Sequence, residues 1–488
     1  MGAASISSDT AYTINKSCRF NRNTTSRMTR TVSGTATDGS KGIIGCWFKK
    51  SGLEVTQTLF GCTGQGFLID FSALDELLIQ DAGYMVAKSS QYFRDPAAWY
   101  HLVGSYDSDE GTAKNRFQLY INGVRLTDFS TTGFSYIADG EVWGYTKDTN
   151  PVTIGSSESD YRWWDGYMSQ CFLLDGKSIQ NGDYTIASFG EFNNNVWRPV
   201  DLTGLTFGTN GYLLDFEDAS AMGNDVSGND NDWAVDNIGT DDQVIDTPTQ
   251  NYATFASNSG RLFSGGGDSM TWTDGNLHVA GITTQNCCDV TFPTLNSGKW
   301  YFTWDHDTWY NANNDMGIVN EDNRSGQNGT PTSNYSDIAG AVMVGLELST
   351  KYNVQSADFT NIAATIPVTA TTSDQTVMAV DIDNLKLWAG FWDESEDDLY
   401  WLANDGTWSS ANVDVPGTGS DETCAITGSG FTFWSWCYST RGGGTDFGAV
   451  NGGLLSNITQ PSGFNELNTD NISEPTIQNS KKYFDTIL

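Results

Sequence analysis

Two neighbouring runs decide the fold of this chain: WYHLV at residues 99–103 and NRFQLYINGVRL at residues 115–126. Apolar and polar side chains alternate from Phe117 to Ile121, which is the period of two that buries one face of a β-strand. Asn122 and Gly123 follow at once, and both residue types accept the positive φ angles of a tight type I′ turn. The stretch predicts a β-hairpin, with WYHLV as a further strand.

Length and composition favour an all-β protein with two hydrophobic cores. A chain of 488 residues exceeds one ordinary β-sandwich, so two domains are expected. Its 17 Trp, 20 Tyr and 25 Phe are enough for two aromatic cores. The 52 Gly, set among abundant Asn, Asp, Ser and Thr, predict many turns and few helices.

The charge and the chain start exclude several classes of partner. A formal net charge of −35 opposes binding to nucleic acid or to anionic membranes, and it suits solubility in a salty medium. The start MGAASISSDT lacks the basic and apolar regions of a secretory signal. The longest apolar stretch, near 339–348, is far short of the roughly 20 residues that span a bilayer. We expect a soluble protein made in the cytoplasm, with no nucleic-acid partner and no membrane insertion.

Several blocks around the opening stretch carry a family resemblance. They are CRFNRNTTSRMTR at Cys18, GIIGCWFKKSGLEVTQTLFGC at Gly42, FRDPAAWYH at Phe93 and DGYMSQCFLLDGKSI at Asp165. With the WYHLV strand and the LYING hairpin, they resemble the laminin-G-like or concanavalin-A-like jelly roll. The match is similar to the first module of large virion structural proteins of tailed phages, especially phages of marine bacteria.

A second module follows an acidic connector. The run from Val377 to Trp408 resembles the SPRY module, with turns at Asp383-Asn384 and at Asn404 to Gly406, although the acidic residues 394–398 look inserted. The tail from Pro461 is similar to the segment after this module in the phage proteins. The resemblance implies two tandem concanavalin-like jelly-roll β-sandwiches joined by an extended linker. The expected division is a sandwich at 1–216, a linker at 217–250, a SPRY-like sandwich at 251–460 and an extended strap at 461–488.

Catalytic constellations are missing from the sequence. Glycosidases need two carboxylates held across a cleft, and no alternating run of Glu and Asp supplies them. Glu394 and Glu396 lie in the cluster DESEDD, which is typical of a solvated loop. His101, His278 and His306 stand in separate segments without a nucleophile elbow, and His101 is expected to pack within its strand. We therefore predict a protein that is not an enzyme.

Binding is favoured over turnover because exposed aromatic faces stack on sugar rings while Asp and Asn accept hydrogen bonds from hydroxyl groups. Two clusters have that composition. The alternative for each is that its aromatic residues fill the core. The candidate ligand-binding residues are Asp160, Tyr161, Trp163, Trp164, Asp165, Trp304, Asp307, Trp309 and Tyr310.

The sequence supports a metal site less strongly than a glycan site. No cofactor is predicted. Laminin-G-like modules often hold Ca²⁺ at a rim, so the acidic loops 107–110 and 225–232 could bind it, with a solvated loop as the alternative.

The eight cysteines show no C-x-x-C spacing and lie in strand-like runs. Buried free thiols are expected, and disulfides would require export.

The favoured function is a phage virion structural protein that acts as a tail fibre or tail-appendage adhesin on host surface glycans. It would be assembled in the host cytoplasm, contact other virion proteins and form a homo-oligomer. One alternative is a capsid decoration or tail-connecting protein without a receptor role. A third is a polysaccharide-cleaving enzyme.

Overall fold

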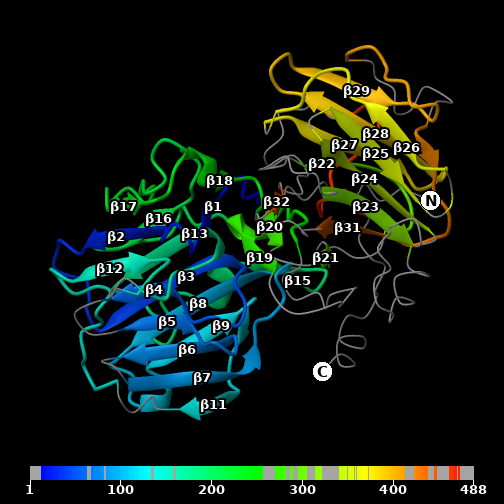
Figure 1. Ribbon diagram of the computed structural model, residues 1–488. Coiled ribbons are helices and arrows are strands. Elements are labelled where there is room, and N and C mark those ends of the chain that lie inside the picture. The colour runs from blue at the N-terminus through cyan, green and yellow to red at the C-terminus, as the bar shows by residue number, and fades with distance from the viewer. Residues whose placement is uncertain are drawn as a thin grey trace, which may run out of the picture. The chain divides into compact units, whose positions relative to one another are not determined.

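The computed structural model describes residues 12–62, 67–81, 84–132, 137–157, 161–255, 270–281, 286–289, 295–304, 314–320, 340–348, 350–356, 358, 360–371, 373–412, 422–437, 445–447, 461–469 and 471–472. Within these ranges the protein is all-β, and every strand pair is antiparallel apart from one isolated bridge (Figure 1). The helices of this part are 3-10 turns at Ala113–Asn115, Ile186–Ser188, Thr240–Asp242 and Asp274–Asn276. No helix in these ranges has the length and apolar character needed to cross a membrane.

The chain forms two compact units. The first contains the described chain up to Arg94 together with Ala98–Asn251, and the second contains Tyr252–Ser473. Each unit has its own aromatic-rich core, in agreement with the two cores expected from composition.

The first unit holds two eight-stranded sheets, which we call sheet I and sheet II. The strands of sheet I are β1 (Ser17–Phe20), β3 (Lys41–Lys50), β8 (Trp99–Asp107), β9 (Phe117–Ile121), β10 (Val124–Arg125), β13 (Gly166–Asp175), β16 (Tyr212–Leu214) and β18 (Gln243–Val244). Their order is β10-β9-β8-β3-β13-β1-β18, and β16 also pairs with β13.

The strands of sheet II are β2 (Arg27–Thr31), β4 (Gln57–Cys62), β5 (Leu68–Phe71), β6 (Glu76–Asp81), β7 (Tyr84–Tyr92), β11 (Phe129–Thr132), β12 (Pro151–Ile154) and β17 (Ala234–Asp236). Their order is β11-β7-β6-β5-β4-β12-β2-β17. A separate hairpin joins β14 (Glu191–Asn193) to β15 (Val196–Arg198).

The opening stretch of the sequence folds as predicted. Asn122 and Gly123 have φ angles of 47° and 74°, and Val124 lies opposite Ile121 across the turn. His101 is 1% exposed, and its ring stacks on Trp47 at 4.5 Å between centroids. Its predicted place inside the packed strand is therefore confirmed.

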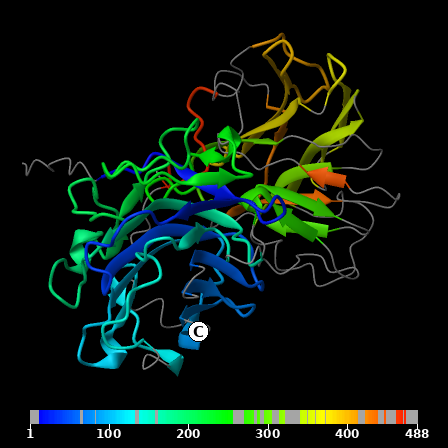
Figure 2. The same cartoon turned by 90° about the vertical axis from the view of Figure 1, so that its left-hand side faces the viewer.

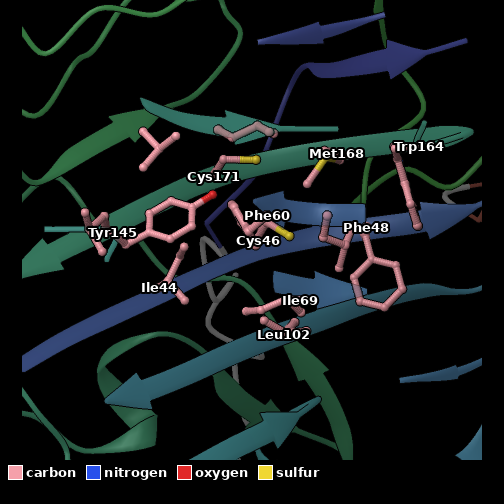
Figure 3. Close-up of a cluster of buried hydrophobic side chains, with 14 of the residues drawn as sticks. Ile44, Cys46, Phe48, Phe60, Ile69, Leu102, Tyr145, Trp164, Met168 and Cys171 are labelled. Carbon is pink, nitrogen blue, oxygen red and sulfur yellow. The ribbon is translucent and has the colours of Figure 1, made fainter. Parts of the chain in front are cut away.

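The inner faces of sheets I and II meet in one core (Figure 3). Ile44, Cys46 and Phe48 on β3 contribute to it from sheet I, and Phe60 and Ile69 contribute from sheet II. Burial of each such side chain is worth about 1.5–3 kcal/mol.

Across the two units, the described cysteine side chains are free and buried, which confirms the predicted thiols at Cys18, Cys46, Cys62, Cys171 and Cys424.

The acidic segment 217–250, expected as an extended connector, lies on the first unit. Residues 234–236 pair with β2 as strand β17, and Gln243–Val244 pair with β1 as strand β18. Trp233 is 4% exposed and Ile238 is 9% exposed, and both belong to the core of this unit. The segment thus supplies edge strands and core side chains to both sheets.

The second unit contains two larger sheets, which we call sheet III and sheet IV, and one small sheet (Figure 2). Sheet III consists of β21 (Asn286–Asp289), β23 (Asn314–Asn320), β24 (Ala341–Leu348), β25 (Lys351–Gln355), β26 (Ile362–Thr365) and β31 (Phe431–Cys437). Sheet IV consists of β22 (Lys299–Trp304), β27 (Gln375–Asp381), β28 (Lys386–Asp393), β29 (Asp398–Leu402) and β30 (Cys424–Ala425). The small sheet consists of β19 (Met270–Thr273), β20 (His278–Gly281) and β32 (Thr445–Phe447).

The hairpins predicted for the second unit are present. The turn at Asp383-Asn384 joins β27 to β28, and Ala403 donates to the carbonyl oxygen of Thr407 across the turn that contains Gly406. Glu394 and Glu396 are exposed in the loop between β28 and β29, as expected of a solvated acidic cluster. Phe302 on β22 stacks on Phe433 on β31 at 3.8 Å between centroids, so sheets III and IV close over one core.

Candidate functional site

The outer face of sheet II carries a polar surface at the β12-β2-β17 end of the sheet. Met28 points into the core, so its neighbours Arg27 and Thr29 lie on the opposite face by strand alternation. Thr31 shares this parity. On β12, Thr153 likewise lies between the core residues Val152 and Ile154.

A groove of about 670 Å³ runs over these strands. This size falls within the usual range of ligand sites. Its lining combines hydroxyl groups, an amide, two arginines and two aspartates with a few apolar atoms. The lining residues are Arg27, Thr29, Arg30, Thr31, Ser33, Pro151, Val152, Thr153, Asp230, Asn231, Asp232 and Ala234.

An aromatic loop at residues 161–165 lies beside the groove. Tyr161 is 51% exposed, and Trp163 is half-buried. The guanidinium carbon of Arg27 lies 5.4 Å from the centroid of the Trp163 ring, and that of Arg162 lies 5.2 Å from the Tyr161 ring. Such cation–π contacts hold the rings in place. Because Arg27 also lines the groove, Trp163 is tied to it.

The backbone of the aromatic loop is anchored along its length. The amide of Thr58 donates to the carbonyl oxygen of Arg162 at 2.9 Å, and the amide of Trp164 donates to Gly155 at 2.8 Å. The amide of Asp165 donates to Oε1 of Gln57 at 2.9 Å. These bonds leave the two outward rings of the loop presented on a fixed backbone.

A buried ion pair reinforces this loop. Nη1 of Arg162 donates to Oδ2 of Asp70, whose side chain is fully buried on β5. Burial raises the pKa of Asp70 to about 6, and the charge of Arg162 and its hydrogen bond oppose that rise. Arg162 adopts a φ of 63°, an unfavourable angle for a side chain of this size, and the ion pair offsets that cost.

The structure corrects part of the predicted ligand set. Trp164 has no exposed surface and lies in the core of the first unit (Figure 3), and Trp304 is 1% exposed in the core of the second. Neither ring can stack on a sugar, because each points inward from its backbone. Asp165 is half-buried and supports the loop through its backbone. Of the first predicted cluster, Tyr161 and Trp163 face outward. Asp160, Asp307, Trp309 and Tyr310 lie outside the described residues.

The arginines of the groove are held by specific partners. Nε of Arg27 donates to Oδ2 of Asp236 at 2.8 Å. Nη1 of Arg30 donates to the carbonyl oxygen of Asn210 at 3.0 Å, and its Nη2 donates to Asn231. Burial lowers the pKa of Arg30, although the group keeps its charge at neutral pH. These bonds fix both guanidinium groups in place.

Sequence reasoning did not find the groove, because strand pairing assembles it from three distant segments. Residues 151–154, 27–31 and 234–236 pair side by side in that order. The residues just before β17 come from the segment that the composition marked as a connector. One local signal was present, the alternation of polar and apolar residues at Arg27, Met28 and Thr29. It predicts an amphipathic strand, but it does not predict which strands lie beside it.

The acidic loops considered for Ca²⁺ have internal partners. Oδ2 of Asp109 accepts from Nζ of Lys41 at 2.9 Å, and Oδ1 of Asp225 accepts from the amide of Leu213 at 2.9 Å. Asp225 also accepts at Oδ2 from the amide of Asn231 at 2.9 Å. Among the described residues no three acidic, histidine or cysteine side chains gather as a metal site.

No protein-family model matches the chain, and no curated protein matches it either. Solved structures do show similarity. A candidate carbohydrate-binding protein from Bacteroides ovatus is 18% identical with a TM-score of 0.31, covering 46% of this chain and 59% of that chain. The chain thus spans less than two thirds of that protein's length.

Two further solved structures are similar to the chain. The heptameric SAP-like pentraxin from Limulus polyphemus is 15% identical with a TM-score of 0.28, covering 39% of this chain and 87% of that chain. Domains LG4-5 of the mouse laminin alpha1 chain are 8% identical with a TM-score of 0.27, covering 92% of each chain. At these values the similarities carry no argument about function. The strand pairing and the two cores themselves establish an all-β protein of two β-sandwiches.

Proposed function

We propose that this protein is a non-enzymatic adhesin that binds surface glycans through the outer face of sheet II. The observation that carries the proposal is the pairing of the Trp163 ring, which contacts Arg27, with a groove rich in hydroxyl, amide and charged groups. Aromatic rings offer an apolar face to a sugar ring, and the polar lining can satisfy its hydroxyl groups. A fold alone would not support this function, whereas this combination does.

The acidic groups around the groove are suited to binding rather than to acid–base catalysis. Oδ2 of Asp236 accepts from Arg27, and Oδ1 of Asp232 accepts from the amide of Asp225 at 2.9 Å. Carboxylates held in this way are fixed hydrogen-bond acceptors. We therefore propose retention of an intact glycan, without cleavage.

The biological setting of the proposal comes from the sequence resemblance to virion proteins of tailed phages. We propose a tail fibre or tail appendage, displayed on the virion after assembly in the host cytoplasm and contacting other virion proteins. A homo-oligomer would present several copies of a weak site, and multivalent display can raise avidity by roughly 10²–10⁴. Capsid decoration or tail connection is the competing role.

Glycan-array binding by the purified full chain tests the proposal. We expect multivalent protein to bind a subset of glycans, and we expect Trp163→Ala to reduce that signal at least tenfold. The matched control is Phe192→Ala, because Phe192 is an aromatic ring that is 57% exposed on the separate β14-β15 hairpin. Absence of any signal at high valency would favour the capsid or connector role, and release of reducing ends from a polysaccharide would favour an enzyme.

A further inference from the structure

We propose that the groove takes an uncharged linear oligosaccharide that lies along β2, with one sugar on Trp163 and later sugars at the opposite end of the strand. This inference rests on the proposed function and adds the class, charge and length of the ligand. Three observations support it: the register of the strands, the balance of charge in the groove, and the distribution of hydroxyl groups.

The strand register places the aromatic loop at one end of the groove. On β12, Pro151 lies opposite Thr31 and Ile154 lies opposite Met28. The chain therefore leaves β12 at the Arg27 end of β2, and the aromatic loop follows a short distance later. The 5.4 Å contact between Arg27 and the Trp163 ring agrees with this placement.

The same register places the other polar cluster at the opposite end. On β17, Ala234 lies opposite Thr29 and Asp236 lies opposite Arg27. Residues 230–232 precede β17, so they lie toward the Thr31 end of β2. The four steps from Arg27 to Thr31 cover about 13 Å at the usual strand rise, and both clusters extend beyond them. This length accommodates several sugar residues in a row and exceeds a single ring.

The charge balance of the groove favours a neutral ligand. Its lining contains two arginines, Arg27 and Arg30, and two aspartates, Asp230 and Asp232, and Arg27 is also paired with Asp236, so no net positive charge remains for an anionic ligand. Both guanidinium groups already donate to protein acceptors. The net charge of −35 on the whole chain further opposes the approach of an anionic polysaccharide.

The remaining lining is suited to sugar hydroxyl groups. Thr29, Thr31 and Ser33 provide groups that both donate and accept hydrogen bonds. They are spaced along the groove between its two ends. The Thr153 hydroxyl is buried and already donates to the carbonyl oxygen of Ser156 at 2.6 Å, so it is left out of this set. A chain of neutral sugars offers the matching pattern of alternating donors and acceptors.

Affinity for ladders of one to six sugar residues tests this inference on the full-length protein. The probes are neutral gluco-, galacto- and manno-configured oligosaccharides and a matched uronic-acid ladder, measured by calorimetry. For at least one neutral ladder we expect affinity to rise at least tenfold from one to three residues. We expect every uronic-acid ladder to bind more weakly.

Two variants locate the ends of the ligand. Trp163→Ala is expected to weaken every ladder member at least tenfold. Asp230→Ala is expected to weaken the longer members at least threefold and to leave the shortest unchanged, whereas Phe192→Ala should change none. Equal affinity for one and six residues, or preference for uronic acids, would overturn this inference alone. If no ladder and no array glycan binds, the proposed function fails as well.

Discussion

The segments 217–250 and 461–472 form an instructive pair, because the sequence predicts both to be extended and each completes a sandwich. The first lies on sheets I and II, and the second lies along the edge of sheet IV. They are held by different chemistry. The acidic segment is locked by a buried ion pair, whereas the C-terminal strap is held by aromatic packing and by a carboxylate shared between two tyrosines.

The ion pair of the first segment is fully enclosed. Nζ of Lys49 lies 2.7 Å from Oδ2 of Asp246, and both side chains have no exposed surface. Lys49 also donates to Asn251 at 2.8 Å, and Oδ1 of Asp246 accepts from Nε1 of Trp99 at 2.9 Å. The charges are thus matched by hydrogen bonds on both sides, as burial of an ion pair requires.

The strap on the second unit relies on neutral groups around one acid. Phe464 is 1% exposed and packs edge-on against Trp388 at 5.8 Å between centroids. The hydroxyl groups of Tyr252 and Tyr301 donate to the two carboxylate oxygens of Glu466 at 2.8 and 2.9 Å. The comparison shows that a few buried side chains are enough to hold an extended segment on a sandwich, even when most of its residues are polar.

The largest expected effect comes from breaking the ion pair. Asp246→Ala should lower the free energy of unfolding of the first unit by about 3–5 kcal/mol, because it leaves the Lys49 charge buried without its acid. Differential scanning calorimetry should show the transition of the second unit unchanged. The double variant Lys49→Met with Asp246→Leu should recover most of the loss, since it removes both charges. A small loss for Asp246→Ala alone would mean that the segment is held by other contacts.

A smaller effect is expected at the strap. Glu466→Ala should cost the second unit about 2 kcal/mol, because two mostly buried tyrosine hydroxyl groups lose their acceptor. Glu466→Gln keeps an acceptor and should cost less than half as much. Denaturant unfolding followed by fluorescence measures both changes. Equal losses for the two variants would show that charge, and not hydrogen bonding, holds the strap.

Alkaline pH should destabilise the unit that the strap completes. Burial, followed by the charge of Glu466, raises the pKa of Tyr301 well above 10. The unfolded chain ionises this group near pH 10, so the second unit should lose about 1.4 kcal/mol per pH unit above that point from this group. Tyr301→Phe should flatten the pH dependence of its unfolding by one proton. An unchanged slope would contradict the buried, protonated phenol.

The smallest effect is expected at the partly exposed pair of the acidic segment. Nη2 of Arg19 lies 3.3 Å from Oδ1 of Asp242, with side-chain exposures of 10% and 17%. Asp242→Asn should cost the first unit about 1 kcal/mol, and 1 M salt should remove part of that cost. The Asp246→Ala penalty should persist in salt. A salt-sensitive Asp246 variant would show that water reaches the Lys49 pair.

Local patterns predicted the features that depend on neighbouring residues. The hairpin at Asn122-Gly123, the turn at Asp383-Asn384 and the exposed acidic cluster around Glu394 each follow from short-range chemistry, and all three are present. The phage origin and the virion role stay predictions. Local patterns did not predict which aromatic side chains are buried. Trp163 faces outward and Trp164 faces the core, although they are neighbouring residues of the same type.

By itself, the sequence determined that the chain is all-β, that Cys18, Cys46, Cys62, Cys171 and Cys424 are buried thiols, and that it has aromatic residues for two cores. Periodicity and turn chemistry act over a few residues, so they can be read without a fold. Only the tertiary structure decided which aromatic rings are exposed, which strands pair with β2, and that Asp246 forms an ion pair with Lys49. Those outcomes depend on pairing between segments about two hundred residues apart. Whether a side chain is buried is decided only when the two sheets of a sandwich pack together, so it cannot be read from the residue itself.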